Sequence, residues 1–84
     1  MFYPDSCPVG YKELEGDEPE WGSYLGGKLN LNRQECAEAC SEKVECLSFE
    51  HSNSKMLCNL NLVSKPRTAP YRDFAFCQKS GNSV

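Results

Sequence analysis

The chain has 84 residues, which predicts a single small domain with a thin core that needs covalent or metal bracing. Its formal net charge of −3 argues against a general nucleic-acid binder, because such proteins usually carry a basic excess. No apolar run approaches the roughly 18 residues that a spanning helix needs, so we expect no direct membrane insertion.

The charge is unevenly distributed along the chain. Residues 1–54 hold eleven acids and four bases, whereas residues 55–84 hold five bases and one acid. The acidic stretch ELEGDEPE, residues 13–20, lacks the regular spacing and the glycine placement of an EF-hand loop. We therefore favour a solvated loop over a cation-binding loop.

Two short strands, in GYKELEG and SYLGGKLNL, are predicted on either side of this loop, and a helix follows them. Asn32 is a suitable N-cap, and Glu35 three residues later completes a capping box. The helix is predicted from about Arg33 to residue 42 or 43. Its apolar stripe combines cysteines one helical turn apart with small apolar residues: Cys36, Ala37, Ala39, Cys40 and Val44.

The second half of the chain predicts three strands. CLSFEH, residues 46–51, alternates apolar and polar residues, and SNS at 52–54 is turn material. MLCNLNL, residues 56–62, predicts a half-buried strand with Asn59 and Asn61 on its outer face, so the two strands form a hairpin. After the proline-containing loop SKPRTAP, the last strand is predicted in YRDFAFC, residues 71–77.

Six cysteines indicate three disulfides and an oxidising compartment. There is no CxxC pair and only one histidine, which disfavours a structural zinc site. A cysteine nucleophile would need an unpaired thiol and a histidine base, for which His51 is the sole candidate. We expect no metal, no cofactor and no enzymatic activity. Six cysteines allow fifteen pairings, and spacing alone does not choose among them.

The N-terminal sequence has no cationic leader and no long apolar stretch, so it is not typical of a signal peptide. Because the cysteines indicate an oxidising compartment, we interpret the chain as a module of a larger secreted or cell-surface protein, with adjacent domains in the parent chain. Residues 1–6 and 78–84 are interpreted as flanking residues.

The cysteine-containing segment resembles the PAN/apple module. The resemblance lies in a helix with the spacing C-x3-C, a third cysteine that opens the strand CLSF, and a fourth cysteine in CNL on the next strand. It covers roughly residues 7–77, and its outer cysteine pair matches the apple version, in which a third bridge joins the two ends. The pairing that the resemblance implies is Cys7–Cys77, Cys36–Cys58 and Cys40–Cys46.

The resemblance also implies a fold and a function. The expected fold is α+β, with one helix packed on a curved antiparallel sheet of about four to five strands and three disulfides. The expected function is a non-enzymatic extracellular module for protein–protein adhesion or docking, with lectin-like carbohydrate binding as the alternative. Its partner would be a protein or a glycan on a cell surface or in extracellular fluid. A secreted inhibitor with Arg67 at the tip of SKPRTAP is a third hypothesis.

Candidate ligand-binding residues are an aromatic pair suited to stacking on a sugar, a surface histidine at the hairpin turn, and three bases suited to an anionic glycan or an acidic protein: Trp21, Tyr24, His51, Lys65, Arg67 and Arg72. Each has a simpler explanation. Trp21 is alternatively a core residue, and the bases are alternatively scattered, solvated charges.

Overall fold

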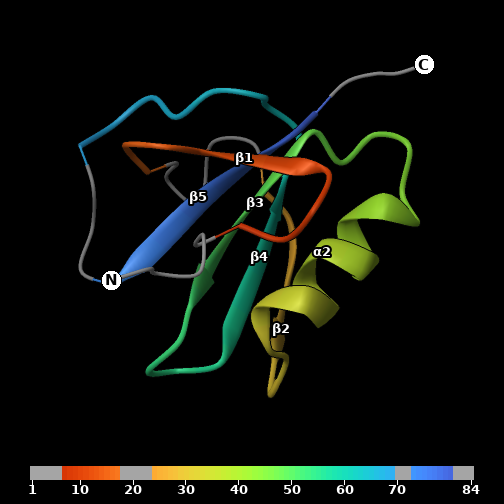
Figure 1. Cartoon of the computed structure of the whole chain (residues 1–84), viewed down its shortest axis with the longest axis vertical. Coiled ribbons are helices and arrows are strands. Elements are labelled where there is room, and N and C mark those ends of the chain that lie inside the picture. The colour runs from red at the N-terminus through yellow and green to blue at the C-terminus, as the bar shows by residue number, and fades with distance from the viewer. Residues whose placement is uncertain (1–6, 18–23, 70–72, 81–84) are drawn as a thin grey trace.

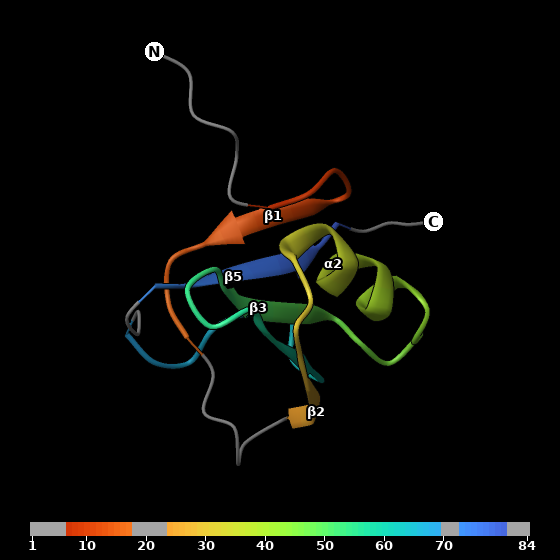
Figure 2. The same ribbon diagram turned by 90° about the horizontal axis from the view of Figure 1, so that it is seen from below.

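The computed structural model describes residues 7–17, 24–69 and 73–80. In this part of the chain, one helix packs on one face of a five-stranded antiparallel sheet with the order β1-β5-β3-β4-β2 (Figures 1 and 2). The α+β prediction, with one helix on such a sheet, is confirmed. The elements are β1 (Tyr11–Leu14), β2 (Tyr24–Leu29), α2 (Arg33–Ser41), β3 (Ser48–Ser52), β4 (Leu57–Asn61) and β5 (Phe74–Lys79).

Helix α2 begins with the predicted capping box. Asn32 Oδ1 accepts a hydrogen bond from the Glu35 amide at 2.7 Å, and Glu35 Oε1 accepts one from the Asn32 amide at 2.8 Å. The helix ends at Ser41, because the Cys40–Cys46 disulfide turns the chain back toward the sheet. Val44 therefore lies outside the helix and is 90% exposed, so its predicted place in the apolar stripe is wrong.

Strands β3 and β4 form the predicted hairpin, with Ser48 opposite Asn61. The prediction that Asn59 and Asn61 face solvent is wrong, since both are buried. The face of the sheet opposite α2 is also covered. Ser48 and Asn61 on this face have hydrogen-bond partners, whereas Asn59 Oδ1 is buried without one among the described residues. Ser48 Oγ donates a hydrogen bond to the Val63 carbonyl and accepts one from Asn61 Nδ2 at 3.2 Å. Burying polar side chains is tolerated when they are hydrogen-bonded in this way.

Two loops are joined on one side of the sheet. The Asp17 amide donates to the Thr68 carbonyl at 3.0 Å, and the Asp17 carbonyl accepts from the amides of Arg67 and Thr68 at 3.0 Å. Gly16 makes this approach possible, because a Cβ at this position would lie 2.6 Å from Cβ of Pro66. Part of the acidic stretch thus lies against the loop SKPRTAP.

Three disulfides tie these elements together. Cys7–Cys77 joins the segment before β1 to β5, Cys36–Cys58 joins α2 to β4, and Cys40–Cys46 closes the turn after α2. These are the pairs that the resemblance implies. They surround a core in which the rings of Tyr11 and Phe49 meet edge to face, with centroids 5.0 Å apart. Bridges of this kind compensate for the small apolar core of a short chain.

Strand β5 differs from its prediction at its C-terminal end. It continues to Lys79, two residues beyond the expected domain boundary at 77. Lys79 Nζ donates hydrogen bonds to the carbonyls of Cys40 and Lys43, at 3.1 and 3.2 Å. The last turn of α2 has no basic residue of its own, so Lys79 supplies the cation that helix C-termini favour.

Within the described ranges, no helix has the length and apolar character needed to cross a bilayer.

Candidate binding surface

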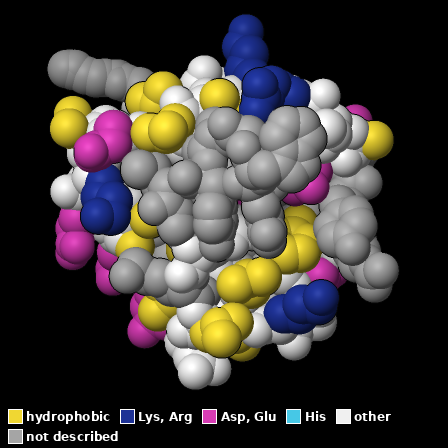
Figure 3. Space-filling view, turned by 180° about the vertical axis from the view of Figure 1, so that it is seen from behind, with side chains coloured by type: hydrophobic (Ala, Val, Ile, Leu, Met, Phe, Trp, Pro, Cys, Tyr) yellow, Lys and Arg dark blue, Asp and Glu magenta, His cyan; other side chains and the backbone are white. Residues whose placement is uncertain are grey.

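A partly exposed apolar group lies at one end of the sheet, with Leu57 half-buried in it. Leu29 at the end of β2 stands opposite Leu57 at the start of β4. The neighbour of Leu57, Cys58, is bridged to α2, so Leu57 and Leu29 point to the opposite face of the sheet. Leu29 is 68% exposed. Figure 3 shows hydrophobic side chains gathered at the lower end of this face, beside a basic side chain.

Met56 extends this group at the end of the β3–β4 turn. Its side chain is 37% exposed, and its backbone has a left-handed conformation with φ of 52°. The Met56 carbonyl accepts a hydrogen bond from the Leu31 amide at 3.2 Å, which fixes the turn beside the start of α2. We name Leu29, Met56 and Leu57 the apolar tip.

A second exposed leucine pair lies at the other end of the hairpin. The Leu47 amide donates to the Asn61 carbonyl at 3.0 Å, and Leu47 and Leu62 flank the last residue pair of the β3–β4 ladder, Ser48 and Asn61. These two side chains are 40% and 44% exposed. Aliphatic surface is therefore exposed at both ends of one rigid hairpin.

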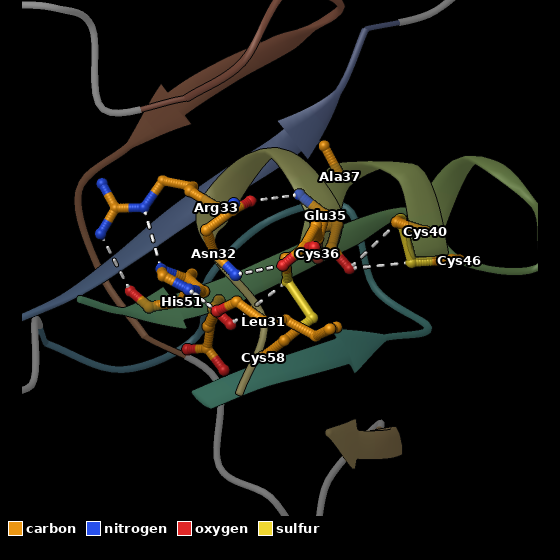
Figure 4. Close-up of a disulfide and its surroundings, with 12 residues drawn as sticks. Leu31, Asn32, Arg33, Glu35, Cys36, Ala37, Cys40, Cys46, His51 and Cys58 are labelled. Atoms are coloured by element: carbon orange, nitrogen blue, oxygen red, sulfur yellow. Dashed lines mark hydrogen bonds between the residues drawn. A yellow bond between two sulfur atoms is a disulfide. The ribbon is translucent and has the colours of Figure 1, made fainter. Parts of the chain in front are cut away.

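The predicted surface position of His51 is wrong, because β3 continues through this residue and its side chain is fully buried beneath the start of α2 (Figure 4). His51 Nδ1 accepts a hydrogen bond from Arg33 Nε at 3.2 Å, so Nε2 carries the proton and donates to the Leu31 carbonyl at 2.7 Å. Burial lowers the pKa of His51, and the charge of Arg33 lowers it further. His51 is thus a neutral structural residue that holds the β2–α2 connection.

Asp73 supports the turn that carries Met56. Its carboxylate accepts hydrogen bonds from Ser52 Oγ at 2.8 Å and from the Ser54 amide at 2.9 Å. These bonds favour the ionised form and lower the pKa of Asp73 to about 2. At neutral pH the carboxylate is therefore ionised and hydrogen-bonded to the turn.

The remaining predicted site residues are not assembled into one site by the described part of the chain. Lys65 and Arg67 are both exposed, in the loop that lies against Asp17. Trp21 and Arg72 lie outside the described residues. Tyr24 begins β2, and its side chain also lies outside what the structure describes.

A family model described as PAN domain matches residues 23–81, which is more than half of the chain. The chain belongs to the PAN domain family. Searches of curated proteins and of solved structures find no match. PAN domains bind proteins or carbohydrates and are generally non-enzymatic, and a disulfide-rich PAN module suggests an extracellular context.

The chemistry of this PAN domain is limited by its disulfides. All six cysteines are bridged, so none offers a thiolate to a substrate or to a metal ion. Among the described residues, no three His, Cys, Asp or Glu side chains come together as a metal site requires. What this part of the molecule offers to a ligand is shape, aliphatic surface and charge.

Sequence reasoning missed the apolar tip of the PAN domain for a local reason. The alternation in MLCNLNL placed Met56 on the same strand face as Cys58 and Leu60. The left-handed backbone at Met56 removes this residue from the strand, and Leu57 then begins the strand on the opposite face. The sequence alone gave little indication of this, because the last residue of the turn takes a left-handed conformation that is typical of Gly or Asn, and this turn has Met there.

Proposed function

We propose that this PAN domain is a non-enzymatic extracellular binding module of a larger secreted or cell-surface protein, and that its ligand is another protein. One observation supports a protein ligand over a sugar. The exposed large hydrophobic side chains of the described residues are all aliphatic: Val9, Leu29, Val44, Leu47, Met56 and Leu62. The described aromatic rings are buried or half-buried. Stacking on a sugar needs an exposed ring, whereas aliphatic side chains gain free energy when a protein surface covers them.

The covalent frame suits this role, because it holds the exposed segments in place before a ligand binds. Preorganised surfaces lose less conformational entropy on binding. We infer that the folded module spans Cys7 to Ser80, since the Ser80 amide still donates to the Gly10 carbonyl at 2.9 Å. The bridged thiols and the buried His51 support the proposal that the domain acts without catalysis.

An array of secreted and membrane-protein ectodomains, probed with the oxidised chain, tests this proposal beside a glycan array. We expect binding to ectodomains that persists after enzymatic removal of their N-glycans, and no signal from neutral or sulfated sugars. The reduced and alkylated chain serves as control and should not bind. A signal confined to the glycan array, or binding to ectodomains that is lost when the N-glycans are removed, would contradict protein docking and favour carbohydrate binding.

A further inference from the structure

We propose that residues 30–35, between strand β2 and the Cys36–Cys58 disulfide, form an acid-sensitive strap. Protonation of His51 at Nδ1 displaces Arg33 and lifts the strap from the sheet, while the rest of the fold stays closed. This response to pH needs no ligand, so it is independent of the proposed function.

The closed strap is held by both nitrogens of one neutral imidazole. His51 Nδ1 accepts a hydrogen bond from Arg33 Nε at 3.2 Å, and His51 Nε2 donates one to the Leu31 carbonyl at 2.7 Å (Figure 4). Arg33 Nη2 also donates to the His51 carbonyl at 3.3 Å. Only a neutral imidazole can accept at one nitrogen and donate from the other, because both nitrogens of the imidazolium are donors.

A proton on Nδ1 is incompatible with this arrangement. The Arg33 guanidinium has donors and no acceptor, so two donors and two positive charges would face each other. His51 is fully buried, and water does not reach its ring while the strap is closed. A buried cation without an acceptor is costly. The charged ring therefore gains its hydration only when the strap opens.

The charged groups that face this pair favour the neutral ring on balance. Burial has the largest effect and lowers the pKa of His51, and the charge of Arg33, which lowers it further, outweighs that of Asp73, which raises it. Glu13 on β1 acts on Arg33 and stabilises its charged form. In the first turn of α2, the Glu35 carboxylate is engaged with the Asn32 amide.

The strands that flank His51 bring no carboxylate to its row of the sheet. The residues paired with His51 are Ala75 on β5 and Cys58 on β4, and neither titrates in the oxidised protein. The next register position, on β2, is Lys28, which is a base. These three positions therefore offer no acidic partner that would replace Arg33 after protonation.

Two anchors confine the opening to the strap. Upstream, the β2–β4 pairing ends at Leu29, and downstream, the bridge from Cys36 to Cys58 fixes the helix to the sheet. The Leu31 amide donates to the Met56 carbonyl at 3.2 Å, so lifting the strap also breaks this link to the apolar tip. Local opening of this kind requires far less disruption than unfolding of the whole domain.

The response has a defined direction and an upper limit. In the open strap the hydrated imidazole titrates near its ordinary value of about 6.5. Each pH unit below this value favours the open strap by up to about tenfold, until the closed state itself takes up the proton. The strap is therefore closed at neutral pH, and acidification of a compartment drives it open.

A pH titration of the ¹⁵N-labelled, oxidised full chain by NMR tests the inference. His51 is the single histidine of the chain, so the imidazole signals need no assignment. At neutral pH we expect the tautomer with the proton on Nε2. On acidification His51 should titrate with a midpoint below about 6.5, and the amide signals of residues 30–35 should shift with the same midpoint. Their protection from hydrogen exchange, corrected for the intrinsic rate, should fall about tenfold or more, while the amides of β5 keep theirs.

Arg33→Met should raise the titration midpoint of His51, because it removes both the opposing charge and the donor to Nδ1. Lys65→Met is the matched control: it also replaces one base by methionine, but Lys65 is exposed in a loop, so the midpoint should not change. His51→Gln should abolish the pH dependence of the strap amides, since glutamine does not titrate.

The wild-type titration decides the matter even if a variant fails to fold. A His51 midpoint at its ordinary value or above, or strap amides that do not follow the titration, would overturn the inference. Loss of protection in β5 at the same pH as in the strap would overturn it as well, because acid would then unfold the domain as a whole. An unchanged midpoint in Arg33→Met would remove Arg33 from the device.

Discussion

Replacing Lys79 by methionine should destabilise the fold through the end of α2. The substitution keeps most of the aliphatic length of the side chain and removes an ammonium group that donates to the Cys40 and Lys43 carbonyls at 3.1 and 3.2 Å. A hydrogen bond to a charged group contributes about 1.5–3 kcal/mol net. Both carbonyls keep a backbone donor in the variant, from the Lys43 and Cys46 amides respectively, so neither is left unpaired. The loss should therefore lie near the lower end of this range, about 1.5 kcal/mol for the pair of bonds.

Differential scanning calorimetry measures this loss. For a domain of this size, about 1.5 kcal/mol corresponds to a decrease in melting temperature of roughly 6–12 °C. Lys65→Met is the matched control, because Lys65 is exposed in a loop and surface substitutions usually change stability by less than about 0.5 kcal/mol. If Lys79→Met melts within the range of this control, the cation does not stabilise the helix end and the reasoning is wrong.

Three further predictions concern pH and backbone conformation. The pKa of His51 is lower in the folded than in the unfolded state, so the folded state binds fewer protons. Its contribution to stability is complete above the unfolded pKa of about 6.5 and is lost as the pH falls through the folded pKa. The free energy of unfolding of the wild type, measured in urea, should decrease as the pH falls across this window, and that of His51→Gln should change less with pH. An equal pH dependence of the two proteins would argue against the neutral imidazole. Asp73→Asn should lower the melting temperature at pH 7, and the difference should shrink as the wild type is acidified from about pH 4 toward its folded pKa of about 2. An unchanged difference across that range would contradict the carboxylate's role in the turn. Gly16→Ala should destabilise the fold by about 1–3 kcal/mol, because the new methyl group meets Pro66 and the φ of 141° is unfavourable. Gly10→Ala, which has a positive φ but no neighbour within 4 Å, should cost less in the same unfolding assay.

Local signals in the sequence were sufficient for the helix and the hairpin. The capping box at Asn32 and Glu35 depends on residues three positions apart, and these contacts form wherever the helix forms. The hairpin also depends on near neighbours, since a four-residue turn joins β3 to β4. Elements held by local interactions of this kind were predicted well.

Long-range contacts account for most of what the sequence did not predict. Alternation in MLCNLNL indicated a face open to solvent, but the segment after β4 covers that face and satisfies Ser48. His51 was placed in a turn because nothing local indicates that Arg33, 18 residues earlier in the chain, packs against it. The role of Lys79 depends in the same way on a helix 36 or more residues before it.

The candidate site was the least predictable part. Its residues come from β2, from the turn and from β4, and they meet only through the strand register. The sequence indicated basic and aromatic candidates by residue type alone. The aliphatic exposure of Leu29 became evident only when the sheet showed that no element covers it in the described part of the chain.

The most direct test of the covalent frame, on which the binding surface depends, is disulfide mapping of the unreduced protein by mass spectrometry. Cleavage by trypsin together with a glutamate-specific protease separates the cysteines, because Glu38 lies between Cys36 and Cys40 and Lys43 follows Cys40. We expect linked peptides for three pairs only, Cys7–Cys77, Cys36–Cys58 and Cys40–Cys46. A free thiol in the folded protein, or a peptide linking Cys40 to Cys58, would contradict the account.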